Sequence, residues 1–168
     1  MVRRIAVIGG SAAGMGAAGA AKQVDADAHV IVFTDQQDVA YSPCGIPYVH
    51  GREIDTFDRL ILQGREYYQQ LGYDIRYGTL VGSVDLGARR LSVEGGDDEP
   101  FDSLVIATGF EYERPAIPGI DLEGIYYVRD IREAMRWDEI LERTKVAAVV
   151  EAQPIGVGDV VADDLSPT

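Results

Sequence analysis

The sequence predicts an α/β fold in which a parallel β-sheet is combined with a β-meander, and three observations carry this prediction. A charge-free apolar run at residues 5–8 ends at paired glycines, and a segment rich in alanine and glycine separates it from a second apolar run at 29–33. Continuous apolar runs are typical of buried parallel strands, so this order predicts a strand–helix–strand unit. Short strand patterns at 80–84 and 90–93 precede a polar turn and predict the meander. A further apolar run at 103–107 predicts another strand of the sheet.

The remaining elements follow along the chain. Residues 57–71 have helical spacing and stop at a glycine, which commonly ends a helix. Residues 73–77 alternate as a short strand, residues 111–119 hold two prolines and predict an extended linker, and residues 131–141 have the pattern of an amphipathic helix. A last apolar run at 146–150 predicts the strand that opens a second unit. We therefore expect a first domain over residues 1–110, a linker and helix over 111–144, and the truncated start of a second nucleotide-binding domain over 145–168.

The composition argues against several classes of function. Acidic residues outnumber basic ones by 28 to 15, and the resulting net charge of −13 disfavours binding to nucleic acid or to an anionic membrane surface. No apolar run approaches the length that spans a membrane. The single cysteine excludes an intramolecular disulfide, so we expect a soluble, cytoplasmic protein. The two histidines have no second ligand in their neighbourhood, so we expect no metal site.

The glycine-rich turn after the first strand indicates a site for a dinucleotide. Gly9-Gly10-Ser11-Ala12-Ala13-Gly14 occupies the pattern G-x-G-x-x-G, with Ser11 at the second glycine. Gly9 permits the tight turn, a small residue at position 11 allows a pyrophosphate to approach the backbone, and Gly14 lets the helix pack on the strand. Exposed N–H groups and the positive end of the helix then face the anion. This arrangement predicts a Rossmann-type fold, and the alternative is a tight turn without a ligand.

The end of the second strand is the expected site of the ribose contact. Dinucleotide-binding folds usually place an acidic residue there, where it binds the adenosine ribose. Thr34 holds that position in this chain, and Asp35 follows one residue later. We expect this contact at Thr34 and Asp35, with the carboxylate of Asp35 serving if the strand end shifts by one residue.

The most specific string in the chain surrounds its single cysteine. Tyr41-Ser42-Pro43-Cys44-Gly45-Ile46-Pro47-Tyr48 places this cysteine about 30 residues after the last glycine of the turn, and a later strand pattern ends as Leu104-Val105-Ile106-Ala107-Thr108-Gly109. With the glycine turn, these segments make the sequence similar to the single-cysteine branch of the pyridine nucleotide–disulfide oxidoreductases. That branch includes coenzyme A disulfide reductases, persulfide and polysulfide reductases, and NADH oxidases and peroxidases. The resemblance runs from Arg4 to about Leu141.

The resemblance implies a cofactor, a redox centre and a class of substrate. Residues 1–110 would form an FAD-binding domain, and the intact enzyme would use NAD(P)H. Cys44 would be the catalytic redox centre, acting on a small-molecule disulfide, a persulfide, oxygen or a peroxide. A homodimer, or completion by another chain, is also implied. The implied cofactor-binding residues are Gly9, Gly10, Ser11, Ala12, Ala13, Gly14, Thr34, Asp35, Pro43, Val81, Ala107, Thr108 and Gly109.

The chemistry of Cys44 follows from its residue type and its neighbour. A thiolate, and not a thiol, attacks a disulfide or a peroxide. The preceding Pro43 predicts the first turn of a helix, whose dipole would favour the thiolate. The alternative is a buried cysteine that only packs.

The chain departs from the family where the NAD(P)H site should begin. Residues 148–157 align with the second glycine motif, but Glu151 and Gln153 replace its first two glycines. A carboxylate at that turn would repel a pyrophosphate, so we expect no NAD(P)H binding by this chain. A rival alignment matches the stretch from Gly156 to Asp159 to the later Gly-Asp segment of the flavin site.

Together these features predict the N-terminal, FAD-binding portion of an NAD(P)H-dependent disulfide or persulfide oxidoreductase that is incomplete as a catalyst in this form. The alternative is a flavin- or nucleotide-binding module without catalysis of its own, completed by a partner chain.

Overall fold

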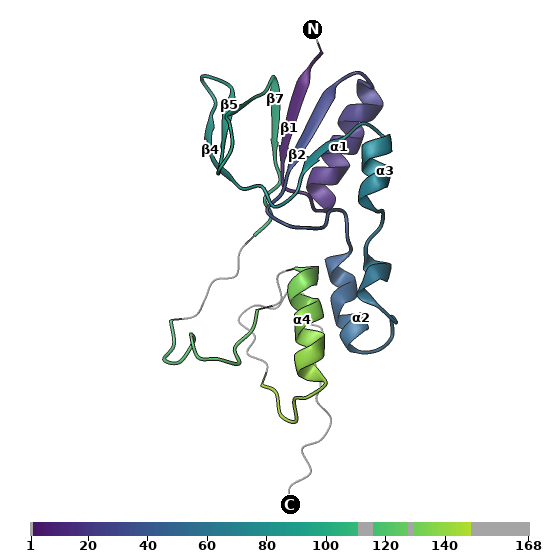
Figure 1. Cartoon of the computed structure of the whole chain (residues 1–168), viewed down its shortest axis with the longest axis vertical. Helices are drawn as coiled ribbons and strands as arrows, with labels where there is room; N and C mark the ends of the chain where they lie inside the picture. The colour runs from purple at the N-terminus through teal and green to yellow at the C-terminus, as the bar shows by residue number, and fades with distance from the viewer. Residues whose placement is uncertain (1, 111–115, 128–129, 149–168) are drawn as a thin grey trace, which may run out of the picture. The chain divides into compact units, whose positions relative to one another are not determined.

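The computed structural model describes residues 2–110, 116–127 and 130–148 (Figure 1). The chain divides into two compact units. The sheet unit comprises Met1–Tyr41 and Ile61–Phe110, and the helical unit comprises Ser42–Leu60 and Glu111–Thr168. Residues 42–60 therefore group with the later part of the chain, although they lie between two segments of the sheet unit. The predicted division at residues 110 and 144 stays a prediction.

The sheet unit contains the predicted parallel sheet. Strands β1 (Arg4–Ile8), β2 (His29–Phe33), β3 (Asp74–Arg76) and β7 (Ser103–Ile106) lie in the order β3-β2-β1-β7, and every neighbouring pair is parallel. Helix α1 (Ala12–Val24) joins β1 to β2, and α3 (Arg65–Gln70) precedes β3. Strands β4 (Val81–Asp85), β5 (Arg90–Val93) and β6 (Glu99–Pro100) form an antiparallel meander. The predicted α/β fold, with a parallel sheet and a β-meander, is thus confirmed.

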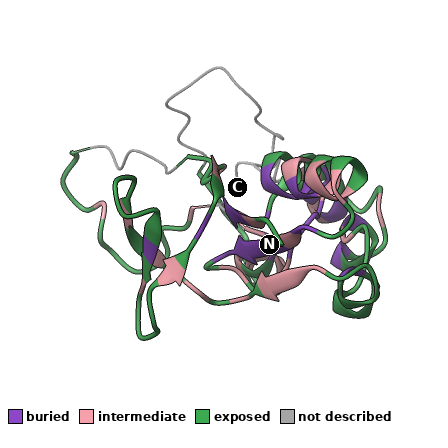
Figure 2. Cartoon of the chain, turned by 90° about the horizontal axis from the view of Figure 1, so that it is seen from above, coloured by how far each residue is buried: buried purple, intermediate pink, exposed green. Residues whose placement is uncertain are grey.

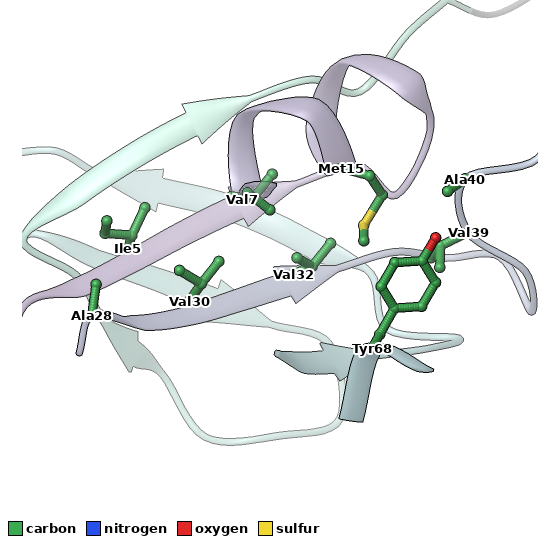
Figure 3. Close-up of a cluster of buried hydrophobic side chains, with 10 residues drawn as sticks. Ile5, Val7, Met15, Ala28, Val30, Val32, Val39, Ala40 and Tyr68 are labelled. Atoms are coloured by element: carbon green, nitrogen blue, oxygen red, sulfur yellow. The ribbon is translucent and has the colours of Figure 1, made fainter. Parts of the chain in front are cut away.

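Side chains of the parallel sheet alternate between two apolar clusters, because successive residues of a strand point to opposite faces. The cluster on the face of α1 and α3 includes Val7, Met15, Val30, Val32 and Tyr68 (Figure 3). The cluster on the other face consists of Ala6, Ile31, Phe33, Leu91 and Phe101, so the meander packs there. Figures 1 and 2 show α1 and α3 on one side of the sheet and the meander on the other. Burial on both faces explains why β1 and β2 are continuous apolar runs.

The prediction of one continuous helix over residues 57–71 is wrong. The structure has a 3-10 helix, η2 (Phe57–Leu60), and then the separate helix α3. The chain leaves the helical conformation between them because Ile61 pairs with Tyr41 in an antiparallel bridge and the Leu62 N–H donates to the Ala40 carbonyl at 3.2 Å. Long-range backbone pairing overrides the local helical spacing.

Other predicted boundaries differ by one or two residues, and some predictions fall outside the described residues. The meander begins at Val81, one residue later than expected, and β3 is shorter than the predicted strand. Residues 146–148 form no strand, and the rest of the strand predicted at 146–150 lies outside the described residues. The same holds for Glu151, Gln153 and the stretch from Gly156 to Asp159.

In its described part, the helical unit consists of short helices and one longer helix. The 3-10 helix η1 (Pro43–Gly45) continues directly into α2 (Ile46–His50), and α4 (Ile131–Leu141) contacts α2. Asp130 caps α4, since its carboxylate accepts the Glu133 N–H at 2.8 Å. Throughout the part of the chain that the structure describes, no helix combines the length and the apolar composition that a membrane span needs.

Candidate functional site

Three loops that carry predicted site residues meet at the carboxyl edge of the parallel sheet. The Gly9 N–H donates to the Phe33 carbonyl at 2.8 Å, and the Ala107 N–H donates to the Ile8 carbonyl at 2.7 Å. Strand β1 has β2 on one side and β7 on the other, and in open α/β sheets ligands bind where the strand order reverses in this way. The structure therefore brings together the glycine turn, the residues after β2 and the residues after β7.

Three glycines of the turn occupy positions that leave no room for a side chain. Gly9 has φ +111°, in the left-handed region, and a Cβ there would overlap the Ala107 carbonyl. A Cβ on Gly14 would overlap the Gly9 carbonyl oxygen. A Cβ on Gly10 would lie 2.6 Å from Cγ1 of Val39. The turn is thus packed between the end of β7 and the start of α1 at a spacing that requires glycine.

The N-terminus of α1 is open. Ser11 is the N-cap, with an extended backbone, and its side chain makes no capping hydrogen bond. Ser11, Ala12 and Ala13 are all exposed. The N–H groups of the first turn and the positive end of the helix dipole can therefore bind an external anion. These residues fit a pyrophosphate, because they offer backbone donors with only small side chains beside them.

The residues after β2 differ in exposure. Thr34 is buried, and its hydroxyl accepts the Gln36 N–H at 3.2 Å. Asp35 is exposed at the same end of the strand. The Thr34 carbonyl accepts the Thr79 N–H at 2.7 Å, which brings the start of β4, with the half-buried Val81, to this edge. Of the two residues predicted for the ribose contact, Asp35 has the exposed side chain, whereas Thr34 stabilises the turn.

Pro43 and Cys44 belong to the helical unit. Pro43 is the first residue of η1, and the Gly45 N–H donates to the Ser42 carbonyl at 3.1 Å. A Cβ on Gly45 would overlap the side chain of Leu60, so this turn packs closely on η2. Cys44 itself is an exposed free cysteine. The alternative of a buried cysteine that only packs is therefore wrong.

A polar cluster that sequence reasoning missed joins α2 to α4. His50, the last residue of α2, places Nδ1 3.1 Å from Oδ1 of Asp138 on α4. The Arg52 guanidinium donates to both carboxylate oxygens of Asp138, at 3.1 and 2.8 Å, and lies 3.5 Å from Glu142. We term these four residues the Asp138 cluster. Asp138 is 88 positions from His50 and 86 from Arg52, so no local spacing could have revealed it.

Two opposing effects act on the pKa of Asp138. Partial burial raises the pKa, but hydrogen bonds from Arg52 and His50 lower it, and the resulting pKa lies below that of an ordinary aspartic acid. Asp138 is therefore ionised at neutral pH. Among the described residues, no group of three or more His, Cys, Asp or Glu side chains is arranged to hold a metal ion.

Comparison with known proteins shows the family of the chain. Residues 3–158 match the family described as pyridine nucleotide-disulphide oxidoreductase. The chain belongs to this family of NAD(P)H oxidoreductases, which use FAD together with NAD(P)H. The resemblance seen in the sequence is thus confirmed.

Two curated relatives have similar identity to the chain. The NADH oxidase of Methanocaldococcus jannaschii is 35% identical over 161 residues, which cover 92% of this chain and 36% of the relative. The NAD(P)H coenzyme A polysulfide/persulfide reductase of Pyrococcus horikoshii is 35% identical over 152 residues, which cover 89% of this chain and 34% of the relative. The chain therefore spans about a third of the length of these relatives.

Solved structures share the fold. The NAD-dependent persulfide reductase from A. fulgidus superposes with a TM-score of 0.78 at 30% identity, over 83% of this chain and 27% of that protein. The reduced CoADR-RHD protein of Bacillus anthracis superposes with a TM-score of 0.80 at 22% identity, over 84% of this chain and 27% of that protein. At the lower identity, the likeness shows the fold alone.

Proposed function

We propose that this chain is the FAD-binding portion of an NAD(P)H-dependent disulfide or persulfide oxidoreductase and that Cys44 is its redox centre. The observation that carries the proposal is the glycine turn, in which three glycines without room for a side chain lead into the open N-terminus of α1. A turn of this kind at the carboxyl edge of a parallel sheet suits the pyrophosphate of a dinucleotide. Because the family uses FAD, we assign FAD to this turn.

The residues around the turn suit the other parts of the cofactor. The backbone N–H groups of the first turn of α1 would bind the pyrophosphate, while Gly9, Gly10 and Gly14 shape that turn. The exposed Asp35 carboxylate would accept hydrogen bonds from the adenosine ribose. The backbone of Val81 and residues 107–109 would complete the site, as the resemblance implies. When bound, FAD supplies a centre that takes up and releases two electrons.

Cys44 would carry out the sulfur chemistry. Its exposed thiolate would attack one sulfur of a disulfide, so that a new S–S bond forms to Cys44 while the substrate S–S bond breaks and the second sulfur leaves as a thiolate. Returning Cys44 to the thiolate consumes two electrons, for which NAD(P)H is the reductant of the complete enzyme. Pro43, at the first position of η1, would hold the backbone of this turn.

The substrate of the complete enzyme is a small molecule in this proposal. The curated relatives are named as an NADH oxidase and as a coenzyme A polysulfide/persulfide reductase, which supports oxygen and persulfides, with disulfides and peroxides as chemically related substrates. We also propose a cytoplasmic protein, since a single cysteine allows no intramolecular disulfide.

Substitution of Ser11 tests the assignment of the pyrophosphate. Asp at the N-cap would stabilise α1, but its negative charge would lie beside the proposed phosphates. We expect Ser11→Asp to raise the Kd for FAD, measured by quenching of flavin fluorescence, by about tenfold or more, which corresponds to about 1.4 kcal/mol.

Ser11→Asn is the matched control, because asparagine has the same shape as aspartate and is an equally good N-cap without the charge. It should bind FAD within a few-fold of the unsubstituted chain. Equal affinities of Ser11→Asp and Ser11→Asn would show that the pyrophosphate does not lie at this turn, and a chain that binds no FAD at all would refute the flavin assignment.

A second candidate function is a flavin-binding module without catalysis of its own, completed by a partner chain. It is favoured by β7, which is the edge strand of the parallel sheet in the described part of the chain and leaves Ile106 64% exposed at its carboxyl end. An open edge with an exposed apolar side chain can accept a further strand. A stable complex with a chain that restores NADH-dependent reduction would favour this candidate.

A further inference from the structure

The turn that carries Cys44 is continuous with α2. Helix η1 ends at Gly45, α2 begins at Ile46, and the Ile46 N–H donates to the Pro43 carbonyl. Ile46 and Val49 of α2 are both buried. Because α2 follows η1 without an intervening residue, the position of Cys44 depends in part on how α2 is held.

The carboxyl end of α2 is held by a buried histidine. The His50 side chain is only 6% exposed, and its ring meets that of Phe57 edge-on at 5.4 Å. Its Nε2 is buried and has no hydrogen-bond partner within the described part of the chain. Among the residues that the structure describes, Asp138 is therefore the one polar partner of the ring, with Nδ1 3.1 Å from its Oδ1.

The Asp138 carboxylate also binds Arg52, which follows α2 in the chain. Arg52 has φ +61°, a left-handed conformation that is uncommon for a residue with a side chain. Its guanidinium donates to both oxygens of Asp138, at 3.1 and 2.8 Å. Since the Arg52 side chain is half exposed, its ion pair with Asp138 contributes little to stability by itself. The buried contact between His50 and Asp138 contributes more to the link between α2 and α4.

From this arrangement we infer that Asp138 is a positioning residue for Cys44. Within the described residues, it is the one carboxylate in contact with both His50 and Arg52, and it links the end of α2 to α4. Removing it leaves a buried imidazole without its polar partner, so the carboxyl end of α2 loses its polar link to α4 and the orientation of the Cys44 turn changes. This inference rests on the proposed redox role of Cys44.

The test compares the reactivity of Cys44 with and without FAD in the 168-residue chain. We expect saturating FAD to slow alkylation of Cys44 by iodoacetamide at least fivefold in the unsubstituted chain, because the proposed redox role of Cys44 requires its thiol to exchange electrons with the bound flavin. In Asp138→Ala we expect this protection to fall below twofold while the Kd for FAD changes less than threefold, since the glycine turn is unaltered. Loss of general stability would instead weaken FAD binding as well.

Further variants control for effects on folding. Glu139→Ala, which changes an exposed acid of the same helix, should keep full protection. Asp138→Glu keeps the carboxylate and should retain part of the protection by FAD. Asp138→Asn is a milder change than alanine, for use if Asp138→Ala does not fold, and it should lose part of the protection. Full protection in both Asp138→Ala and Asp138→Asn would overturn the inference alone. An unsubstituted chain that binds FAD without protecting Cys44 would overturn the redox role of Cys44, and this inference with it.

Discussion

Gly14 and Gly16 lie two residues apart in α1, but only Gly14 is needed for the close packing of this helix. A Cβ on Gly14 would overlap the Gly9 carbonyl oxygen and would lie 3.4 Å from Cγ1 of Val7. A Cβ on Gly16 would have no heavy atom within 4 Å. At the scale of single residues, the space around each position therefore explains why the last glycine of the G-x-G-x-x-G pattern is required and Gly16 is not.

Alanine substitutions at these two glycines should have opposite effects. Gly14→Ala should lower the free energy of unfolding by about 2 kcal/mol or more, because the backbone of the turn has to move. Gly16→Ala, the matched control, should raise it by about 1 kcal/mol, since alanine favours helix over glycine. Urea denaturation followed by circular dichroism measures both changes. Equal effects of the two substitutions would contradict the packing described for Gly14.

At the scale of elements, a charged network supports the edge strand β3. Arg76 donates from Nε to Asp74 at 2.7 Å, and His29 of β2 lies 3.6 Å from the same carboxylate. Arg76 also lies 3.8 Å from Glu99 of the meander, which pairs in turn with Arg4 of β1 at 2.8 Å. The network therefore links β3 to its neighbour in the sheet and to the meander.

The pKa of Asp74 makes part of this stability depend on pH. The hydrogen bond from Arg76 lowers the pKa of Asp74, burial opposes that shift, and His29 adds to it, so the net pKa is below the ordinary value. The folded chain thus binds this proton less tightly than the unfolded chain does. The stabilisation is fully present above the unfolded pKa of about 4 and is lost as pH falls through the folded pKa.

Asp74→Asn should therefore lower the free energy of unfolding at pH 7 by about 1 kcal/mol, and the difference from the unsubstituted chain should shrink at acidic pH. Urea denaturation at several pH values measures this dependence. Asp27→Asn, in the exposed turn before β2, is the control and should have little effect at any pH. If the free energies of unfolding of Asp74→Asn and of the unsubstituted chain differ by the same amount at every pH, the lowered pKa of Asp74 does not contribute to stability as proposed.

At the scale of the whole molecule, the chain has a flavin-type sheet unit but only about a third of the length of its curated relatives. Glu151 and Gln153 stand where the resemblance places the first glycines of the NAD(P)H motif. A carboxylate there would repel the pyrophosphate of NAD(P)H. The chain should therefore bind FAD without accepting electrons from NADH.

Anaerobic titration tests this expectation. NADH should leave the visible absorbance of the bound flavin unchanged, whereas dithionite, which needs no binding site, should bleach it and serves as the control. Bleaching by NADH at a rate that saturates with NADH concentration would contradict our interpretation of Glu151 and Gln153.

Local sequence patterns were sufficient to predict the fold class and the family. The apolar runs of β1 and β2, the glycine turn and the string around Cys44 predicted the α/β fold and the family, and both are confirmed. These features are readable in sequence because strand burial, turn geometry and motif spacing each involve residues that are close along the chain. The roles of the individual site residues stay predictions, which the Ser11 and Asp138 variants test.

Only the tertiary structure decided the features that depend on distant partners. The pairing of Ile61 with Tyr41 interrupts the helix predicted over residues 57–71. The contact between His50 and Asp138 joins residues 88 positions apart. In each case the deciding interaction is a hydrogen bond or a packing contact between segments that are distant in sequence and meet only in the folded chain. Local propensity therefore cannot predict it.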